Sequence, residues 1–580
     1  MIKPKSTLNN VIPYQTDKIK HNWRLKLDSN ENIYGTSPVV LSAIKNFPAE
    51  DISLYPTYGK LIDKLAQKYF VEPDNILLSN GCDEAINIIL NAYLEKGDEI
   101  LSYVPTFQMP HLYAKIIGAE VKTVEYEEKF VFDQEKLKAN INEKTKVVYV
   151  ATPNNPTGEL IKASIIELLI KDFPETLFIV DCTYINFAYN VTLQDYIDLT
   201  LKYDNIVVLK SFSKDFAMAG LRIGFSTANK EIIKNLKKIA SPYNVNAIAI
   251  ACAQAVLNDE KNFEEIKEQN ASVREFLFNG LFEAGYKPYK SEANFLLCDF
   301  GAHCDFYFDK LRKNGIIVRN FPKNSPVSTC LRITIPTLGG AKYILELLNK
   351  KDVLIFNLDG VIFDVVDSYL KAISLTFKHF SSEEISLEEI IEAKNTGGLD
   401  CDWDAVKHLL KKRGLDIDIS DIISVFQKYV CSSSDGNGAL INKSKLLISK
   451  ETFEELSKKY DMVVFSGHLM DEIQYLLEKF EIDKFFYYFI TSDDLPKNFL
   501  KPHSKGVFEI LEHCPHLSVK YLGASIDDII AGNGANIDTI GVIPPNVDNN
   551  VMVNNFRHLG AKYILNDINI LTSFLKDIEA

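Results

Sequence analysis

The sequence lacks the features that mark membrane, secreted and nucleic-acid-binding proteins. Its most apolar stretch, residues 247–257 (AIAIACAQAVL), falls well short of the run of about 20 apolar residues that spans a bilayer, and its start has no apolar signal core. The nine cysteines form no pair at metal-ligand spacing, which fits reduced thiols. The net charge of −14 argues against a polyanionic partner, because phosphate-backbone binding needs clustered Lys and Arg. We expect a cytoplasmic protein with no membrane or nucleic-acid partner.

The chain has 580 residues, too many for one hydrophobic core, and its pattern restarts near residue 350. On both sides of that point, short apolar runs alternate with stretches of helical periodicity, which is typical of α/β folds. We therefore predict one domain over 1–350 and a second over 351–580. In the second domain, residues 367–450 are mostly helical and charged before buried strands return.

The most informative stretch is SFSKDFAMAGLRIGF (211–225), in which Lys214 follows a buried strand. A lysine in a loop is usually just solvated, but Ser211, Ser213 and Arg222 can converge beside it on one phosphate. Lys214 is then placed to form a Schiff base with an aldehyde next to that phosphate. A Gly-turn opening a helix, SNGCDEAI (79–86), adds amides that can bind phosphate at a helix N-terminus. These amides are those of Gly81, Cys82 and Asp83.

Two further stretches supply what a pyridine cofactor needs. FIVDCTY (178–184) puts Asp181 at a strand end, where a carboxylate can keep a ring nitrogen protonated and make the ring an electron sink. Tyr184 can reach the ring hydroxyl, and Asn155, in TPNNPTGE (152–159), can donate to the same group. Each stretch alone could be a plain turn or cap. Together, in this order, they predict a pyridoxal-phosphate site.

These motifs resemble those of the class I/II aminotransferases, and within them the histidinol-phosphate aminotransferases. The resemblance covers about residues 14–337 and includes LDSNENIYG (27–35), YPTYG (55–59), NNPTG, SFSK and LRIT (331–334) in order. It implies a fold-type-I PLP-dependent transferase with a large domain over about 50–250 and a small domain from 1–49 plus 251–350. It also implies a homodimer with active sites at the subunit interface.

The same resemblance implies further contacts around the cofactor and the substrate. Tyr55 would reach the partner's cofactor phosphate, and Phe107 would stack on the pyridine ring. Tyr14 and the stretch from Asn30 to Asn32 would line the substrate entrance. Arg332 would bind the terminal anion of the substrate, and Arg319 would add a second anion contact. Two converging arginines favour a phosphate ester, although Arg319 could instead form a surface ion pair.

We therefore expect a transaminase that acts on a small phosphorylated amine or amino alcohol such as histidinol phosphate, with an amino or keto acid as co-substrate. Asp181 holds the ring nitrogen positive, and the freed Lys214 moves a proton as a general base. The same electron sink supports a decarboxylase of phosphorylated hydroxy-amino acids, of the phosphoserine or phosphothreonine type. Sequence does not separate these two outcomes. A non-catalytic scaffold is a third alternative, against which the intact Lys214, Asp181 and Arg222 set argues.

Residues 353–570 resemble the haloacid dehalogenase-like hydrolases, whose motifs appear in order. VLIFNLDGVIFD (353–364) matches the first motif, FSGH (465–468) the second, LKPHSKG the third and YLGASIDDIIAG (521–532) the fourth. The resemblance implies a Rossmann-like core, 351–366 and 451–580, with a helical cap over 367–450. The residues it places in the phosphate pocket are Asn357, Asp359, Ser466, Lys501, Asp527 and Asp528.

Two positions depart from the hydrolase pattern. Asn357 replaces the nucleophilic aspartate, and Ala524 replaces an acid of the fourth motif; both acids are expected magnesium ligands. An amide cannot form the aspartyl-phosphate intermediate, and even indirect damage to a metal site costs about 10–100-fold. We predict a pseudo-phosphatase, in which Asp359 and Asp528 remain as candidate Mg²⁺ ligands. The alternative is a bifunctional enzyme whose working phosphatase acts on the product of the first part.

Overall fold

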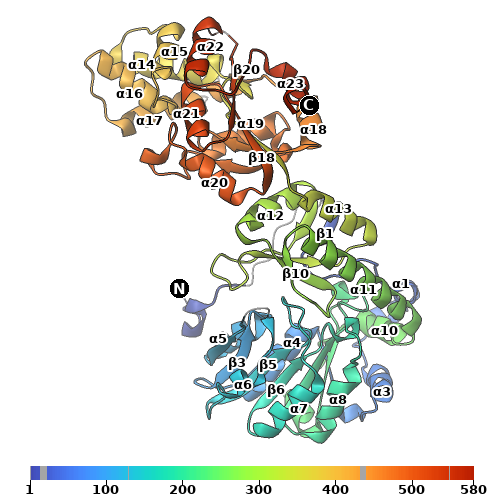
Figure 1. Cartoon of the computed structure of the whole chain (residues 1–580). Helices are drawn as coiled ribbons and strands as arrows, with labels where there is room; N and C mark the ends of the chain where they lie inside the picture. Colours follow the sequence, from blue (N-terminus) through green and yellow to red (C-terminus); the bar gives the residue numbers. More distant parts are fainter. Residues whose placement is uncertain are drawn as a thin grey trace. The chain divides into compact units, whose positions relative to one another are not determined.

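The computed structural model describes residues 2–13, 23–127, 130–431, 439–545, 547 and 549–579 (Figure 1). Contacts divide the chain into two compact units. The first unit consists of Met1–Cys304 and Gly315–Leu348, and the second of Asp305–Asn314 and Asn349–Ala580. Among the helices in these described ranges, none has the length and apolar character needed to cross a membrane.

A seven-stranded sheet forms the centre of the first unit. All neighbouring strands run parallel except β8, which is antiparallel to both of its neighbours. In spatial order the strands are β2 (Ile76–Ser79), β8 (Gly224–Ala228), β7 (Ile206–Ser211), β6 (Leu177–Asp181), β5 (Thr145–Ala151), β3 (Glu99–Val104) and β4 (Glu120–Glu125).

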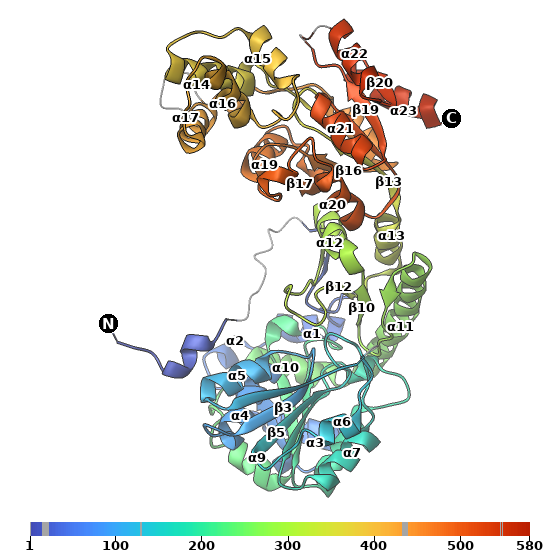
Figure 2. The ribbon, with the colours of Figure 1, turned by 60° about the vertical axis from the view of Figure 1, so that its left-hand side comes forward.

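Helices cover both faces of this sheet, as its continuously apolar central strands require. Because side chains alternate along a strand, Val148 and Val208 belong to one core cluster, while Val147 and Val207 belong to another. In Figure 2, α4, α5 and α9 lie on one side of β3 and β5, and α6 and α7 lie on the other. The helices around the sheet are α3 (Gly59–Lys68), α4 (Cys82–Tyr93), α5 (Met109–Ile117), α6 (Gln134–Lys138), α7 (Ala163–Asp172), α8 (Leu193–Lys202), α9 (Lys230–Leu236) and α10 (Ala247–Val256).

The rest of the first unit is built around two small sheets. One is antiparallel, in the order β12-β10-β9, and the other pairs β1 with β11 in parallel. Their strands are β1 (Leu25–Leu27), β9 (Lys287–Pro288), β10 (Phe295–Asp299), β11 (Ile316–Val318) and β12 (Cys330–Thr334). The accompanying helices are α1 (Pro38–Lys45), α2 (Ala49–Ile52), α11 (Glu260–Glu283) and α13 (Leu338–Leu348), while most of α12 (Cys304–Lys313) groups with the second unit.

The second unit contains a six-stranded, fully parallel sheet. Its strands, in spatial order, are β17 (Phe486–Ile490), β16 (Tyr460–Phe465), β13 (Lys351–Phe356), β18 (His516–Gly523), β19 (Asp538–Val542) and β20 (Tyr563–Leu565). The helices between and after these strands are α18 (Lys450–Ser457), α19 (Met470–Lys479), α20 (Lys505–His513), α21 (Ile526–Gly534), α22 (Asn549–His558) and α23 (Leu571–Glu579).

A helical cap is inserted after the first strand of this sheet. The chain enters and leaves the cap through a short antiparallel pair, β14 (Phe363–Asp364) and β15 (Lys445–Leu446). Apolar side chains of the cap, among them Phe377 and Leu409, belong to the same buried cluster as Phe356 of β13. Cap and core therefore share one hydrophobic interior. The cap helices are α14 (Lys371–Ser381), α15 (Leu387–Lys394), α16 (Asp402–Lys412) and α17 (Ile419–Cys431).

Candidate active site

A cavity of about 560 Å³ opens in the first unit where β5, β6 and β7 end. Because the carboxyl ends of parallel strands meet at one edge of the sheet, the polar residues that follow these strands are brought together. The predicted residues that line the cavity are Cys82, Asp83, Phe107, Asn155, Asp181, Tyr184, Ser211, Ser213, Lys214, Arg222, Arg319 and Arg332.

One end of the cavity is suited to a phosphate. Gly81 precedes α4 with a φ of +80°, and a Cβ at this position would lie 2.6 Å from Nη2 of Arg222. Only glycine therefore lets the guanidinium approach the N-terminus of α4, where the first amides of a helix can bind an anion. Arg222 also pairs with Asp83, at 3.1 Å between Nη2 and Oδ2. The buried hydroxyl groups of Ser211 and Ser213 complete this end.

Asp181 lies at the end of β6 with its carboxylate fixed by two neighbours. The Tyr149 hydroxyl donates to Oδ2 at 2.9 Å, and Thr183 donates to Oδ1 through its hydroxyl at 2.6 Å and its amide at 3.0 Å. Burial raises the pKa of Asp181, while the hydrogen bonds from Thr183 and Tyr149 act against that rise. A buried carboxylate held in this way favours a cationic partner such as a protonated ring nitrogen.

Lys214 lies in the loop after β7, and its Nζ donates to the backbone oxygen of Ser29 at 2.7 Å. Burial, with a further contribution from the charge of Arg332, lowers the pKa of Lys214 to about 8. A lysine with a lowered pKa is a better nucleophile and a better general base near neutral pH than an ordinary surface lysine.

Arg319 and Arg332 face the cavity as neighbours. Their backbones pair across an antiparallel bridge, with N–O distances of 3.0 and 2.8 Å, so both side chains lie on the same face. Arg332 is 7% exposed, and its guanidinium donates to Oδ1 of Asn155 and to the backbone oxygen of Asp28. Two adjacent guanidinium groups present forked donors that match a phosphate or carboxylate.

Of the remaining predicted residues, Asn30 lines this cavity, whereas Asn32 and Tyr55 do not. Asn30 lines it and donates from Nδ2 to the Tyr184 hydroxyl at 3.1 Å, whereas Asn32 donates to the backbone oxygen of Asp215 at 3.1 Å. Tyr55 is 75% exposed and stacks on Tyr243, with ring centroids 4.3 Å apart. Tyr14 lies outside the described residues.

Several residues around the cavity were missed by reasoning from the sequence. Tyr149 and Thr183 hold the Asp181 carboxylate, and Trp23 and Lys26 line the cavity. Tyr149 had a usable signal, because it precedes the predicted Asn155 loop on β5 and shares a face of the sheet with Ala151, two residues on. Trp23 and Lys26 precede the recognised motif at 27–35 and carry no pattern of their own.

The second unit contains a small polar cavity at its own sheet edge, with an open volume of about 20 Å³, room for about one water. Asn357, Asp359 and Ser466 line it, while Asp528 and Lys501 are buried beside Asn357. The side chains from the cap that line it are Asp400, Cys401, Asp402, Trp403, Phe426 and Gln427. Five of the six residues predicted from the hydrolase motifs are thus brought together under the cap, and the sixth, Asp527, accepts from the Gly398 amide of the cap segment.

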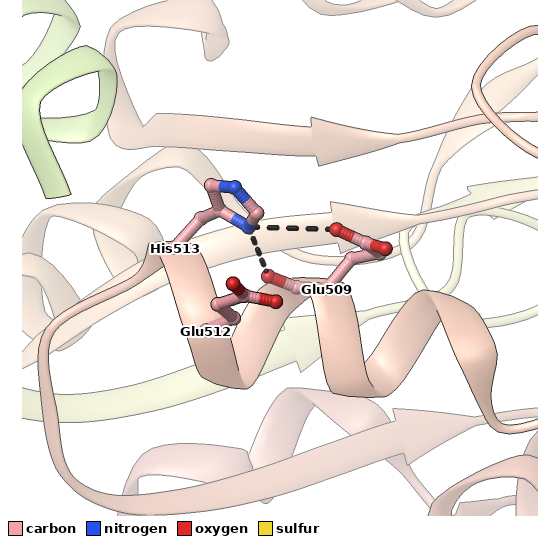
Figure 3. A group of neighbouring side chains, drawn as sticks. All are labelled: Glu509, Glu512 and His513. Atoms are coloured by element: carbon pink, nitrogen blue, oxygen red, sulfur yellow. Dashed lines mark hydrogen bonds and ion pairs between the residues drawn. The ribbon is translucent and has the colours of Figure 1, made fainter. Parts of the chain in front are cut away.

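A different group of side chains has the spacing of a metal site. On α20, Glu509, Glu512 and His513 place one potential ligand atom each within 4.8 Å of one another (Figure 3). They follow the i, i+3, i+4 spacing of one helix face, and Nδ1 of His513 lies 2.8 Å from the Glu509 backbone oxygen. None of the three is a motif position of the hydrolase pattern, so this surface group adds nothing to the expected magnesium site.

Comparison with known families agrees with both halves of this description. A family model described as aminotransferase class I and II matches residues 24–348. The chain belongs to this family. A second model, haloacid dehalogenase-like hydrolase, matches residues 354–542. The predicted family and fold class of each part are confirmed.

The histidinol-phosphate aminotransferases among the relatives cover the N-terminal part of the chain. Histidinol-phosphate aminotransferase 1 of Carboxydothermus hydrogenoformans is 36% identical over 343 residues, which cover 58% of this chain and 95% of the relative. Histidinol-phosphate aminotransferase of Methanocaldococcus jannaschii is 32% identical over 334 residues. This match covers 56% of this chain and 88% of the relative. The crystal structure of a putative histidinol-phosphate aminotransferase from Erwinia carotovora atroseptica aligns with a TM-score of 0.53 and 28% identity, covering 56% of this chain and 94% of that one.

Members of this aminotransferase family are expected to use pyridoxal phosphate, and the cavity fits it. Arg222, the α4 amides and the two serines form an anion site at one end, and the buried Asp181 lies at another wall. Lys214 lines the same cavity with a lowered pKa. The anion site therefore suits the phosphate of the cofactor, Asp181 suits its protonated ring nitrogen, and Lys214 suits its aldehyde.

The second unit does not fit Mg²⁺ in the same way. Oδ1 of Asp528 accepts from Lys501 at 2.8 Å and from the Tyr521 hydroxyl at 2.6 Å, and Oδ2 accepts from Nδ2 of Asn357 at 2.8 Å. Oδ2 also accepts from the amides of residues 524 and 525. Asp359 pairs with Nε2 of His468 at 2.7 Å. Burial opposes the charge on His468, but Asp359 outweighs it and raises the His468 pKa. Lys501 thus already binds Asp528, and His468 already binds Asp359, so both candidate Mg²⁺ ligands are paired with cations of the protein.

Proposed function

We propose that this chain is a pyridoxal-phosphate-dependent transaminase of a small phosphorylated amine or amino alcohol such as histidinol phosphate. The observation that carries the proposal is one cavity that combines a cofactor-type lysine and carboxylate with two adjacent arginines, Arg319 and Arg332. The two guanidinium groups carry two positive charges, whereas one carboxylate carries a single negative charge. A phosphate ester is a dianion that can pair with both arginines. The histidinol-phosphate aminotransferases among the relatives support this substrate class.

When bound, the cofactor supplies an electron sink for the bonds at the substrate's α-carbon. Asp181 keeps a proton on the ring nitrogen, and Tyr149 and Thr183 hold its carboxylate in place. Lys214, whose pKa is lowered to about 8, would take the proton from the substrate's α-carbon and deliver it to the carbon of the cofactor's aldehyde group, which is the proton shift that transamination requires. Arg319 and Arg332 orient the substrate through its anion, so that the α-hydrogen faces Lys214.

Product analysis on the full-length protein tests this proposal. With pyridoxal phosphate, histidinol phosphate and a 2-keto acid, we expect the ketone and an amino acid, and Lys214→Ala should abolish both. Lys230→Ala, which removes a 51%-exposed surface lysine, is the matched control and should leave the rate unchanged. Release of carbon dioxide from phosphoserine or phosphothreonine, without ketone formation from histidinol phosphate, would favour the decarboxylase instead.

We also propose that the enzyme is a cytoplasmic homodimer. Apolar side chains concentrate on the exposed surface of residues 39–55, which is unusual for a monomer. They include Leu41, Ile44, Ile52, Leu54 and Tyr55. Tyr55 does not reach the cavity of its own unit, which fits a role in a partner's site. The nine free thiols are consistent with a reducing compartment.

Active-site complementation tests the homodimer. Tyr55→Ala and Lys214→Ala should each be weakly active or inactive alone. In a mixed dimer, one site combines Lys214 from the first subunit with Tyr55 from the second, so activity should return on mixing. If mixing restores nothing while dimers form, Tyr55 acts within its own subunit or not at all.

For the second unit we propose a phosphatase-like domain without turnover. The nucleophile position holds an amide, and the candidate metal ligands are committed to Lys501, Asn357 and His468. Full-length protein should therefore release no phosphate from an aryl phosphate in the presence of Mg²⁺. The double variant Asn357→Asp, Ala524→Asp should raise the rate above that baseline. Turnover by the unmodified protein at ordinary enzyme rates would support the bifunctional alternative.

A further inference from the structure

In the second unit, the segment between α15 and α16 of the cap makes a tight turn onto the core. Gly397 and Gly398 have φ values of +86° and +74°, in the left-handed region that favours glycine. This turn directs the Gly398 amide at the buried carboxylate of Asp527, with N–O distances of 2.9 and 3.0 Å. The two residues that follow are thereby fixed against the core, and the second of them is Asp400.

Asp400 places its carboxylate on the lysine of the third hydrolase motif. Oδ2 of Asp400 lies 3.1 Å from Nζ of Lys501, whose side chain is 1% exposed. On its other side the carboxylate rests against Gly467, next to Ser466: a Cβ there would lie 2.8 Å from the same oxygen. The Asp400 carboxylate therefore fills the space between the second-motif loop and the third-motif lysine.

The surrounding charges hold this arrangement closed. Lys501 is shared between Asp400 and Asp528, and although burial works against its charge, these two carboxylates raise the Lys501 pKa. Lys394 donates to the Asp400 backbone oxygen at 3.3 Å and pairs with Asp402. With about 20 Å³ of open volume, the pocket has no room for a phosphate group beside the carboxylate.

We propose that Asp400 takes the place of a substrate phosphate on Lys501, so that the cap is latched by the protein's own anion and a phosphate dianion binds only by displacing it. The chemistry is shared, because a carboxylate and a phosphate both accept charge-assisted hydrogen bonds from a buried lysine. The ligand class is inorganic phosphate or a phosphate monoester. The inference deepens the proposed function of a domain without turnover, since a latched pocket excludes substrate as well as metal.

Phosphate binding by the full-length protein, loaded with pyridoxal phosphate, tests the latch. Hydrogen exchange is followed on cap peptides covering 394–402 and on the peptide that contains Lys501, while inorganic phosphate or methyl phosphate is titrated. We expect weak or undetectable protection in the unmodified protein. Asp400→Asn keeps the shape but removes the charge, and should bind phosphate at least about tenfold more tightly, because one competing charge-assisted hydrogen bond is worth that factor.

Three further variants make the outcome decisive. Asp400→Ala should gain phosphate binding as Asp400→Asn does. If one of these two variants fails to fold, the other still tests the proposal. Lys501→Met in the Asp400→Asn background should lose the gain. Asp404→Ala is the matched control, because it removes a cap–core ion pair with the 71%-exposed Lys497 and leaves Lys501 untouched.

Equal affinity in the unmodified protein and both Asp400 variants overturns the latch, as does binding that survives Lys501→Met. Protection by methyl phosphate but not by inorganic phosphate would identify a monoester as the ligand, and the reverse would identify free phosphate. Hydrolysis of an aryl phosphate by the unmodified protein would contradict the proposed function instead, so the two failures are distinguishable.

Discussion

The substitution Asn357→Asp tests whether the second unit has replaced metal coordination with internal hydrogen bonding. Asn357 is 4% exposed, and its Nδ2 donates to Oδ2 of Asp528 at 2.8 Å. The substitution exchanges this donor for a second buried carboxylate at the same distance. In the hydrolase pattern magnesium is bound by such carboxylates, whereas here Lys501 holds the other oxygen of Asp528, Oδ1, at 2.8 Å.

The expected cost follows from this geometry. Two charges 2.8 Å apart repel by about 6 kcal/mol at an effective dielectric constant of about 20. The folded protein can avoid this repulsion at lower cost by keeping the new carboxyl group protonated. For a group with an unfolded-state pKa of about 3.9, this protonation costs about 1.4 kcal/mol of folding free energy for each pH unit above that value. The variant should therefore lose about 4 kcal/mol of stability at pH 7 through this group.

The loss of stability depends on pH through the protonation of the new carboxyl group. The new carboxyl group has a higher pKa in the folded state than in the unfolded state. The two proteins should be equally stable below about pH 4, and the difference should grow as pH rises. Mg²⁺ should recover part of the loss, because the new carboxylate, Asp359 and Asp528 would offer oxygen ligands.

Hydrogen exchange of the full-length protein, read on peptides from β13 and α21, measures this local stability at pH 5 and pH 7 with and without millimolar Mg²⁺. Asn498→Asp makes the same chemical change at an exposed position of the second unit and should be neutral. An Asn357→Asp protein as stable as its parent at pH 7 without metal would refute the reasoning, because it would mean that the Asn357 amide does not hold Asp528.

Two substitutions test the first unit. Gly81→Ala places a methyl group against a guanidinium at a φ of +80° and should weaken cofactor binding by at least about tenfold, whereas Gly59→Ala meets nothing within 4 Å and should leave the titrated cofactor affinity unchanged. Tyr149→Phe removes a hydrogen bond to the Asp181 carboxylate worth about 1.5–3 kcal/mol and should lower kcat about 10–100-fold with little change in KM. Tyr196→Phe, which loses a hydroxyl bonded to a backbone oxygen, should leave kcat unchanged; equal effects of the two tyrosine variants would show a merely structural role for Tyr149.

The sequence predicted the cofactor side of the cavity because its residues are local to strand ends. Lys214, Asp181 and Asn155 follow three different strands, and a parallel sheet brings such positions to one edge whatever the loops do. Arg222 could be predicted as a candidate phosphate ligand because it lies eight residues after Lys214 within one motif. The glycine that admits it, Gly81, was also recognisable as the start of a helix.

Contacts that depend on tertiary placement could not be predicted in the same way. The latch between Asp400 and Lys501 joins residues 101 positions apart, and the cap segment carries no motif. The Tyr149–Asp181 contact depends on β5 lying beside β6 with Ala151 opposite Asp181. The proposed role of Tyr55 in a partner's site depends on a second chain, so the 75% exposure of Tyr55 in a single chain does not test it.

We propose above that Lys214 and Asp181 serve a transaminase whose two arginines hold a phosphorylated amine. A single-turnover experiment tests it most directly: full-length protein loaded with pyridoxal phosphate is mixed with histidinol phosphate in the absence of any keto acid, and the ketone is quantified. We predict about one equivalent of ketone per subunit, many equivalents once a keto acid is added, and none from Lys214→Ala. Ketone formation that survives Lys214→Ala, or its absence from cofactor-loaded protein with any small phosphorylated amine, would contradict the account.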